Sequence, residues 1–182
     1  MDQFVVISGC SGGGKSALLA ELARRGFAVV EEPGRRIIAQ ERLGEGHALP
    51  WNDLAAFSRR AVDMALQDRR QAAALPGPVF FDRGLIDAAA ALEHAAGVPT
   101  AQTCGSERYH RSVFMAPPCR EIYRNDGDRL HSFEDAAAEY MRLLDAFERL
   151  GYCLELLPQI SVPARADWVL DRLGIARTGA PL

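Results

Sequence analysis

One run of residues near the N-terminus governs the interpretation of the whole chain: Gly9-Cys10-Ser11-Gly12-Gly13-Gly14-Lys15-Ser16. It matches the pattern G-x-x-x-x-G-K-[ST] at every required position. Glycines at these spacings let the backbone turn with its amide groups pointing inward, which makes a nest for an anion. The apolar run 4–8 before it predicts a buried strand, and residues 15–25 after it predict a helix whose N-terminal amides would point at the same anion.

The anion that such a loop binds is the phosphate chain of a nucleotide. We expect Lys15 to reach the β- and γ-phosphates of ATP, and the Ser16 hydroxyl to bind Mg²⁺. Lysine and arginine together number 21, and Lys15 is the only lysine, so 21 − 1 = 20 are arginine. A compact ammonium fits between phosphate oxygens where a planar guanidinium does not, which explains this exception. The other residues expected to bind the nucleotide in this loop are Gly9, Ser11, Gly12, Gly13 and Gly14.

Strands and helices alternate along the rest of the chain. Further strands are expected at 27–30, 78–81, 113–116 and 152–156, and helices at 35–43, 85–96 and 162–173. A long helix is expected from a cap at Asn52 to about Ala74, and Ser132 opens a capping box for a helix reaching Leu150. Residues 97–106 are rich in turn formers. The pattern predicts an α/β fold of three layers, α/β/α, with a five-stranded, mainly parallel sheet. One domain is expected over 1–176, with a flexible tail at 177–182.

An acidic residue and an arginine follow the third expected strand. Asp82 and Arg83 come directly after Phe80-Phe81, and ligands bind at the carboxyl edge of open α/β sheets. Asp82 could hold Mg²⁺, and Arg83 could clamp the group that receives the phosphate. The alternative for Asp82 is a structural role, as a strand-end ion pair or a helix cap.

Two glutamates leave the second expected strand at the same edge. Either Glu31 or Glu32 could accept a proton from an acceptor hydroxyl or bind the acceptor by a hydrogen bond. Neighbouring strand residues point in opposite directions, so at most one of them is expected in the site. A solvated acidic turn is the alternative.

Three arginines occupy the stretch after Pro117-Pro118: Arg120, Arg124 and Arg129. We expect an arginine-rich lid, in which Arg120 binds the nucleotide while Arg124 and Arg129 stabilise the charge that develops during phosphoryl transfer. A solvent-exposed charged loop is the alternative.

An aromatic cluster near the start of the long helix offers a ring-binding surface. Trp51 and Phe57 could stack on a planar ring of the acceptor, with Arg60 beside them. Aromatic residues at helical spacing also serve as core, and that alternative stays open.

Composition narrows the class of protein. The four cysteines contain no C-x-x-C pair, and the four histidines share no spacing, so neither a zinc site nor a disulfide framework is expected. No apolar run approaches the ~20 residues of a membrane span. A cytoplasmic protein without membrane contact is expected. The formal charge of −3 disfavours nucleic acid as a partner. A homo-oligomer remains open.

Taken together, these residues resemble a family of P-loop ATPases related to the nicotinamide-riboside kinase domain and, further off, to thymidylate and deoxynucleoside kinases. The resemblance covers roughly residues 2–174. It includes the F-x-R-R run at 57–60, and its more distinctive parts are the segment with Phe80, Asp82, Arg83 and Gly84 and the lid segment Tyr123-Arg124-Asn125-Asp126. It implies that Asp82 and Arg83 contact the acceptor, and that Glu32-Pro33-Gly34 is similar to the acceptor-binding turn of thymidylate kinases. No further thymidylate-specific residues are found, so the resemblance does not name the substrate.

Three functions are consistent with these features. The leading hypothesis is a kinase that transfers the γ-phosphoryl group of ATP to a small acceptor, a nucleoside or a nucleotide. The second is a nucleotide-dependent regulatory switch, or slow ATPase, acting on a protein partner. It would have no open acceptor pocket. The third, a kinase acting on nucleic-acid ends, is disfavoured by the acidic charge.

Overall fold

The computed structural model describes residues 3–10, 12–43, 47–118 and 132–176. Its centre is one sheet of five strands, in the order β2-β3-β1-β4-β5, and every neighbouring pair is parallel. The strands are β1 (Phe4–Gly9), β2 (Ala28–Val30), β3 (Val79–Asp82), β4 (Ser112–Ala116) and β5 (Cys153–Leu156). The parallel five-stranded sheet expected from the sequence is confirmed.

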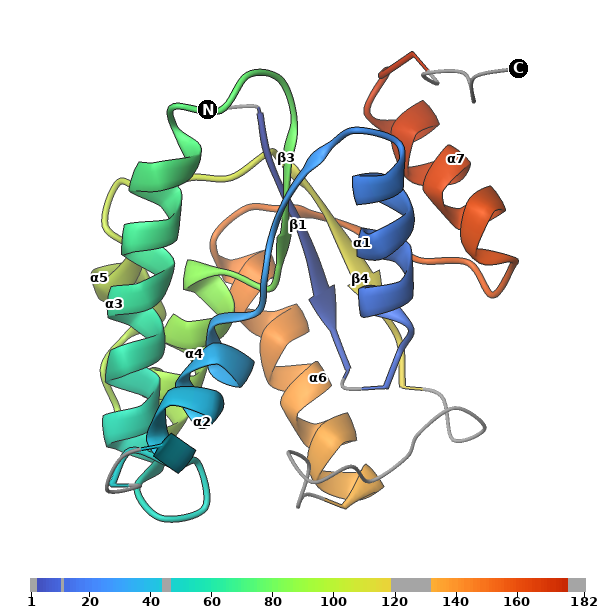
Figure 1. Ribbon diagram of the computed structural model, residues 1–182. Coiled ribbons are helices and arrows are strands. Elements are labelled where there is room, and N and C mark those ends of the chain that lie inside the picture. The colour runs from blue at the N-terminus through green and yellow to red at the C-terminus, as the bar shows by residue number, and fades with distance from the viewer. Residues whose placement is uncertain (1–2, 11, 44–46, 119–131, 177–182) are drawn as a thin grey trace.

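Helices cover both faces of this sheet (Figure 1). The helices are α1 (Lys15–Arg24), α2 (Pro33–Leu43), α3 (Leu54–Ala72), α4 (Leu85–Ala96), α5 (Thr100–Cys104), α6 (Phe133–Arg149) and α7 (Val162–Arg172). One core contains side chains of α1 and α7, and the other contains side chains of α2, α3, α4 and α6. The fold therefore has three layers, as predicted. No helix within the described ranges is long and apolar enough to cross a membrane.

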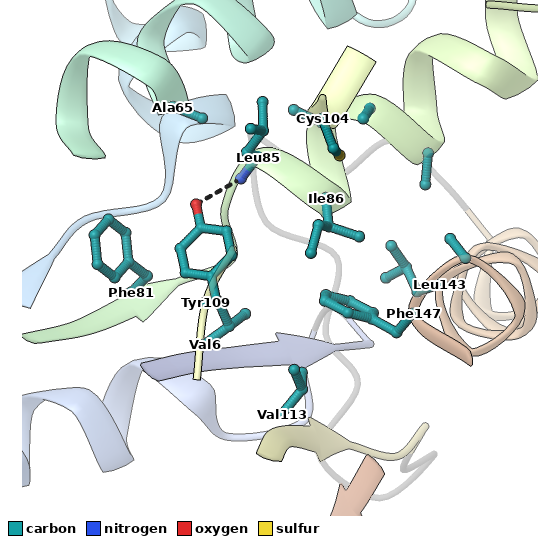
Figure 2. Close-up of a cluster of buried hydrophobic side chains, with 14 of the residues drawn as sticks. Val6, Ala65, Phe81, Leu85, Ile86, Cys104, Tyr109, Val113, Leu143 and Phe147 are labelled. Carbon is teal, nitrogen blue, oxygen red and sulfur yellow. Dashed lines mark hydrogen bonds between the residues drawn. The ribbon is translucent and has the colours of Figure 1, made fainter. Parts of the chain in front are cut away.

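Apolar side chains point to alternate faces along the strands, which explains why helices cover both faces of the sheet. In β1, Val6 faces the core of the α3, α4 and α6 side, while Val5 and Ile7 face the α1 and α7 side. Figure 2 shows the core that contains Val6, with Phe81 of β3 beside Tyr109 and with Phe147 and Leu143 of α6 side by side. A strand with apolar residues on both sides can be buried only between two layers of helices.

Some element boundaries differ from the sequence-based expectation. The long helix α3 is capped by Asp53, whose side chain accepts from the backbone N–H of Ala56 at 2.8 Å, and not by Asn52. The Asn52 amide is used instead to close the preceding turn onto the Leu49 carbonyl. The prediction for Ser132 is confirmed, because Ser132 and Asp135 form the capping box of α6.

Two stretches are helical that were not expected to be, residues 33–34 and 100–104. Helix α2 begins at Pro33 and not at residue 35, since proline is well suited to the first helical position, where its missing N–H costs nothing. The turn-rich stretch 97–106 contains the short helix α5. One turn of helix is too short to produce a periodic pattern, so no pattern in the sequence predicts it.

The carboxyl ends of all five strands meet at one edge of the sheet. Strand β1 lies between β3 and β4. The helices that follow β1 and β3, α1 and α4, pack on opposite faces of the sheet. Such a switch point opens a crevice beyond the strand ends, which is where open α/β sheets bind ligands.

Candidate active site

The loop from Gly9 to Ser16 connects β1 to α1 at this switch point. Gly9 has a φ of 108°, and a Cβ on it would lie 2.3 Å from the carbonyl oxygen of Ala116 on β4. The next amide, of Cys10, donates to that same oxygen at 2.8 Å. Only glycine therefore permits the loop to leave β1 so close to β4. Ser11, another predicted phosphate ligand, lies outside the described residues.

The lysine of the loop is buried and turned toward the loop itself. Lys15 Nζ donates to the carbonyl oxygens of Cys10 at 2.9 Å and Gly9 at 3.3 Å. Burial and, secondly, the nearby charge of Arg83 lower the pKa of Lys15, while the charge of Asp82 opposes this effect. The ammonium has carbonyl partners but no paired carboxylate among the described residues. It is thus placed to exchange these carbonyls for phosphate oxygens.

Asp82 ends β3 beside this loop, since its strand position pairs with Ile7 of β1. Its side chain is buried, and Oδ1 makes no hydrogen bond among the described residues. Burial raises the pKa of Asp82 to about 6, although the charge of Lys15 opposes this. Neither structural alternative is found in the described part of the chain, because Gly84 precedes α4 as its cap and Asp82 forms no ion pair.

An unpartnered buried carboxylate oxygen beside a phosphate loop fits a divalent cation. Asp82 and the exposed hydroxyl of Ser16 are the groups on this chain that would hold Mg²⁺. The described residues contain no group of three or more His, Cys, Asp or Glu side chains that could form a protein-only metal site. The two groups fit an ion that takes most of its ligands from phosphate and water.

Arg83 links the phosphate loop to the elements around it. Its guanidinium forms ion pairs with Glu32, after β2, and with Glu139 of α6, and it donates to the Gly9 carbonyl at 3.2 Å. Burial alone would lower the pKa of Arg83, but the Glu139 and Glu32 carboxylates raise it well above its ordinary value. Arg83 has a φ of 61°, which is rare outside glycine and directs the side chain toward the loop.

A cavity of about 330 Å³ opens next to Arg83, between α2, α3, α4 and α6. Its walls are mainly apolar, and three of its carboxylates, Glu32, Asp87 and Glu139, act on Arg83. The apolar lining includes Ile38, Pro50, Leu54, Phe57, Ala88, Ala91, Ala136 and Leu143, and the charged lining is Glu32, Arg35, Arg83, Asp87, Asp135, Glu139 and Arg142. A mainly apolar cavity that also presents polar groups is typical of small-molecule sites.

The structure distinguishes between the two glutamates predicted for this site. Glu32 lines the cavity and pairs with Arg83, whereas Glu31 is exposed and is not among the lining residues. Phe57 and Arg60 were both predicted to bind the acceptor. Phe57 lines the cavity, but Arg60 does not. Arg60 pairs with Glu41 and donates to Gln40, both on α2.

The arginines of the predicted lid, Arg120, Arg124 and Arg129, lie outside the described residues. Trp51, the other predicted ring-binding residue, is 37 % exposed and does not line the cavity.

Three acidic residues that line the cavity, Asp87, Asp135 and Glu139, were not predicted for the site. Asp87 is buried on α4, where it accepts from the Ser8 hydroxyl and from the Gly84 amide at 2.9 Å. Burial raises its pKa. Asp87 is a carboxylate within the apolar run 85–92, and this pattern could have indicated a buried functional residue. Glu139 had no such signal, because it is one of several charges on an amphipathic helix.

A basic residue near the loop was also missed. Arg165 of α7 donates from Nη1 to the Gly13 carbonyl at 3.4 Å and from Nε to the Pro158 carbonyl at 3.0 Å. It lies 149 positions after Ser16 (165 − 16 = 149), so only the fold brings it to the loop.

Comparisons with known proteins agree with this fold. A family model described as an AAA domain matches residues 4–165. Among solved structures, a deoxyadenosine kinase from M. mycoides with bound dATP is 14 % identical, with a TM-score of 0.68, and the match covers 94 % of this chain and 99 % of the other. No curated protein sequence matches the chain.

A second similar structure is a NadR protein in complex with NR, which is 17 % identical with a TM-score of 0.76. The match covers 97 % of this chain and 53 % of the NadR chain, so this chain spans about half of that protein. A NadR protein in complex with NAD and AMP-PNP is 19 % identical with a TM-score of 0.67, and covers 96 % of this chain and 50 % of the other. At these identities the likeness establishes a shared fold.

Proposed function

The chain belongs to the AAA domain family, and from that premise we propose that it is a small-molecule kinase, which transfers the γ-phosphoryl group of ATP to a hydroxyl group of a nucleoside-like acceptor. One observation carries the proposal: Arg83 contacts the phosphate loop and the cavity at once. A group bound in the cavity would therefore lie next to the end of a phosphate chain bound in the loop.

The donor half of the reaction uses the loop. Its backbone amides and the start of α1 would bind the phosphates, and Lys15 would move from the carbonyls of its own loop to phosphate oxygens. Ser16 and Asp82 are the residues proposed to hold Mg²⁺, which when bound would neutralise charge on the transferring phosphoryl group. The arginines at 120, 124 and 129 are proposed to cover the site, as expected from the sequence.

The acceptor half uses the strand ends. The acceptor oxygen attacks the γ-phosphorus, the bond from that phosphorus to the β–γ bridging oxygen breaks, and ADP leaves. The proton of the acceptor hydroxyl passes to a carboxylate, for which Asp82 and Glu32 are the candidates. Asp82, with its pKa of about 6, has an unpartnered oxygen near the loop. Glu32 lies on the cavity side of Arg83.

Hydrogen-bonding groups beside Arg83 favour a free hydroxyl on the acceptor over a phosphate. Arg83 Nε makes no hydrogen bond among the described residues, and Glu32 Oε1 lies 3.5 Å from it. A hydroxyl group can accept from this N–H and donate to this carboxylate together. A phosphate dianion can only accept, and it would meet Glu32, Asp87 and Glu139 near Arg83, in a cavity lined by four carboxylates and three arginines. We therefore favour a nucleoside acceptor over a nucleotide.

The size and lining of the cavity are consistent with this acceptor. About 330 Å³ lies within the range of small-molecule sites. Phe57 and the alanine face of α4 offer flat apolar walls on which a planar ring could lie. A regulatory switch would not need such a cavity next to its phosphate loop.

The test is ATP consumption with Mg²⁺ in the presence of nucleosides, their 5′-monophosphates, nicotinamide riboside and other small hydroxyl compounds. We expect one or a few nucleosides to stimulate turnover and to yield a product of the mass of the phosphorylated acceptor. Stimulation by monophosphates alone would overturn the nucleoside assignment and leave the kinase assignment standing. Slow hydrolysis that no compound accelerates would overturn the kinase assignment and favour the regulatory switch.

A further inference from the structure

Arg165 is a basic residue at the phosphate loop that the proposed reaction has not used. It projects from the first turn of α7, and its Nη1 contacts the carbonyl of Gly13, within the loop. The contact is close, because a Cβ added to Gly14 would lie 3.0 Å from the same Nη1. The Nε group is held separately by the Pro158 carbonyl at 3.0 Å. This hydrogen bond to Pro158, a residue outside the loop, holds the guanidinium beside the loop.

The charge of this guanidinium is not neutralised within the described protein. Arg165 forms no ion pair there, and both of its recorded partners are backbone carbonyls. The other arginines near it are paired: Arg25 with Glu21 and Asp167, and Arg172 with Glu155. A half-buried cation without a carboxylate partner, next to a loop built for anions, is suited to an anionic ligand.

The position of Arg165 specifies which part of the ligand it would meet. The acceptor cavity lies on the side of α3, α4 and α6, and a γ-phosphate must face it for transfer. Arg165 comes from α7, which packs with α1 on the opposite face of the sheet. Figure 1 shows α1 and α7 together on that side. The α-phosphate and nucleoside of a donor bound in the loop must extend away from the cavity, toward the α7 side.

We propose that Arg165 binds the donor nucleotide at its α-phosphate, on the side of the loop opposite the acceptor cavity. This inference rests on the proposed function for the identity of the donor. It assigns to α7 a role in nucleotide binding that is separate from Lys15 and from the acceptor site. The planar fork of the guanidinium allows it to keep its bond to Pro158 while other N–H groups reach a phosphate oxygen.

The experiment is equilibrium binding of ATP and of ADP, each with Mg²⁺, to the wild-type chain and to Arg165→Gln. Both nucleotides carry an α-phosphate, so we expect both to bind about tenfold more weakly to the variant. Arg172→Gln is the matched control, because it removes an exposed arginine two turns further along the same helix. It should bind both nucleotides as the wild type does.

The salt dependence of nucleotide binding distinguishes an ionic contact of Arg165 with the nucleotide from a merely structural role. If the lost contact is ionic, the difference between wild type and Arg165→Gln should shrink as the salt concentration rises, and Arg165→Lys should recover part of the affinity. Equal binding by wild type and Arg165→Gln, a loss confined to ATP, or a loss independent of salt would each overturn the assignment. Wild-type chain that binds neither nucleotide would overturn the proposed function as well.

Discussion

The phenolic oxygen of Tyr109 lies directly against Gly84, so closely that a Cβ on Gly84 would be 2.6 Å from it. The same oxygen accepts a hydrogen bond from the amide of Leu85 at 2.9 Å (Figure 2). Tyr109 is buried, and burial raises its pKa to about 12, so it stays a neutral phenol. A residue of the core therefore holds the turn from which Asp82 and Arg83 reach the site.

We predict that Gly84→Ala disrupts this turn. The added methyl group must displace either the ring of Tyr109 or the backbone of Arg83, and a small displacement of catalytic groups is costly. Acceptor-stimulated turnover should fall on the order of 10²-fold, with a lower melting temperature. Adding Tyr109→Phe to Gly84→Ala should restore part of the activity, because the nearest atom is then removed. No recovery in the double variant would contradict this account.

Asp82→Asn should lower kcat on the order of 10²-fold or more, because it removes the carboxylate proposed to hold Mg²⁺ or accept the proton. Steady-state kinetics with saturating ATP and acceptor measure this. The change should not lower the melting temperature of the nucleotide-free protein, since the lost carboxylate is buried and Oδ1 is unpartnered. The control is Asp63→Asn, at an exposed position of α3. An unchanged kcat would indicate that Glu32, and not Asp82, holds Mg²⁺ or accepts the proton.

Lys15→Arg tests why the chain keeps a single lysine. A guanidinium preserves the charge but does not fit where the ammonium lies between the carbonyls of Gly9 and Cys10. ATP·Mg²⁺ should bind at least about tenfold more weakly to Lys15→Arg, and Lys15→Ala should abolish turnover. Isothermal titration calorimetry gives the affinity. Wild-type affinity for ATP in both variants would show that the loop does not bind the donor nucleotide.

Glu32→Gln and Glu31→Gln form a matched pair at neighbouring positions. Of these two glutamates, Glu32 lines the cavity and faces Arg83. Its substitution should therefore raise the KM for the acceptor about tenfold and leave the KM for ATP nearly unchanged. Glu31→Gln, at an exposed position, should behave as the wild type. The reverse result would show that the other glutamate serves the site.

The ion pair between Glu93 of α4 and Arg149 of α6 predicts an acid-sensitive part of the stability. Hydrogen bonds from Arg149 and then from Thr100 lower the pKa of Glu93 to about 2, from an ordinary 4.5. A lowered folded-state pKa stabilises the protein above pH 4.5, and this contribution is lost as the pH falls from 4.5 toward 2.

Urea denaturation measures this contribution through the free energy of unfolding. Glu93→Gln should lower it at pH 7 by less than about 1 kcal/mol, because the pair is partly exposed. The difference from wild type should diminish as the pH falls toward 3. The exposed Glu148→Gln serves as the control, and a difference that does not change with pH would contradict the assignment.

Local sequence determined the loop, the parallel sheet and the two residues at the end of β3. The phosphate loop is a contiguous pattern, and its chemistry needs no distant partner to be recognised. Apolar runs alternating with amphipathic segments specify strands and crossover helices, and parallel strands bring their carboxyl ends to one edge. The place of Asp82 at that edge therefore follows from the local sequence alone.

Tertiary structure decided which other side chains reach that edge. Glu32 and not Glu31 faces Arg83, because the backbone direction at the end of β2 selects one of two neighbours. Arg60 turns to Glu41 on α2 instead of the cavity. Glu139 and Arg165 come from α6 and α7, far along the chain, and no local pattern separates them from ordinary surface charges. Their roles depend on contacts between elements distant in sequence, which only packing of the layers creates.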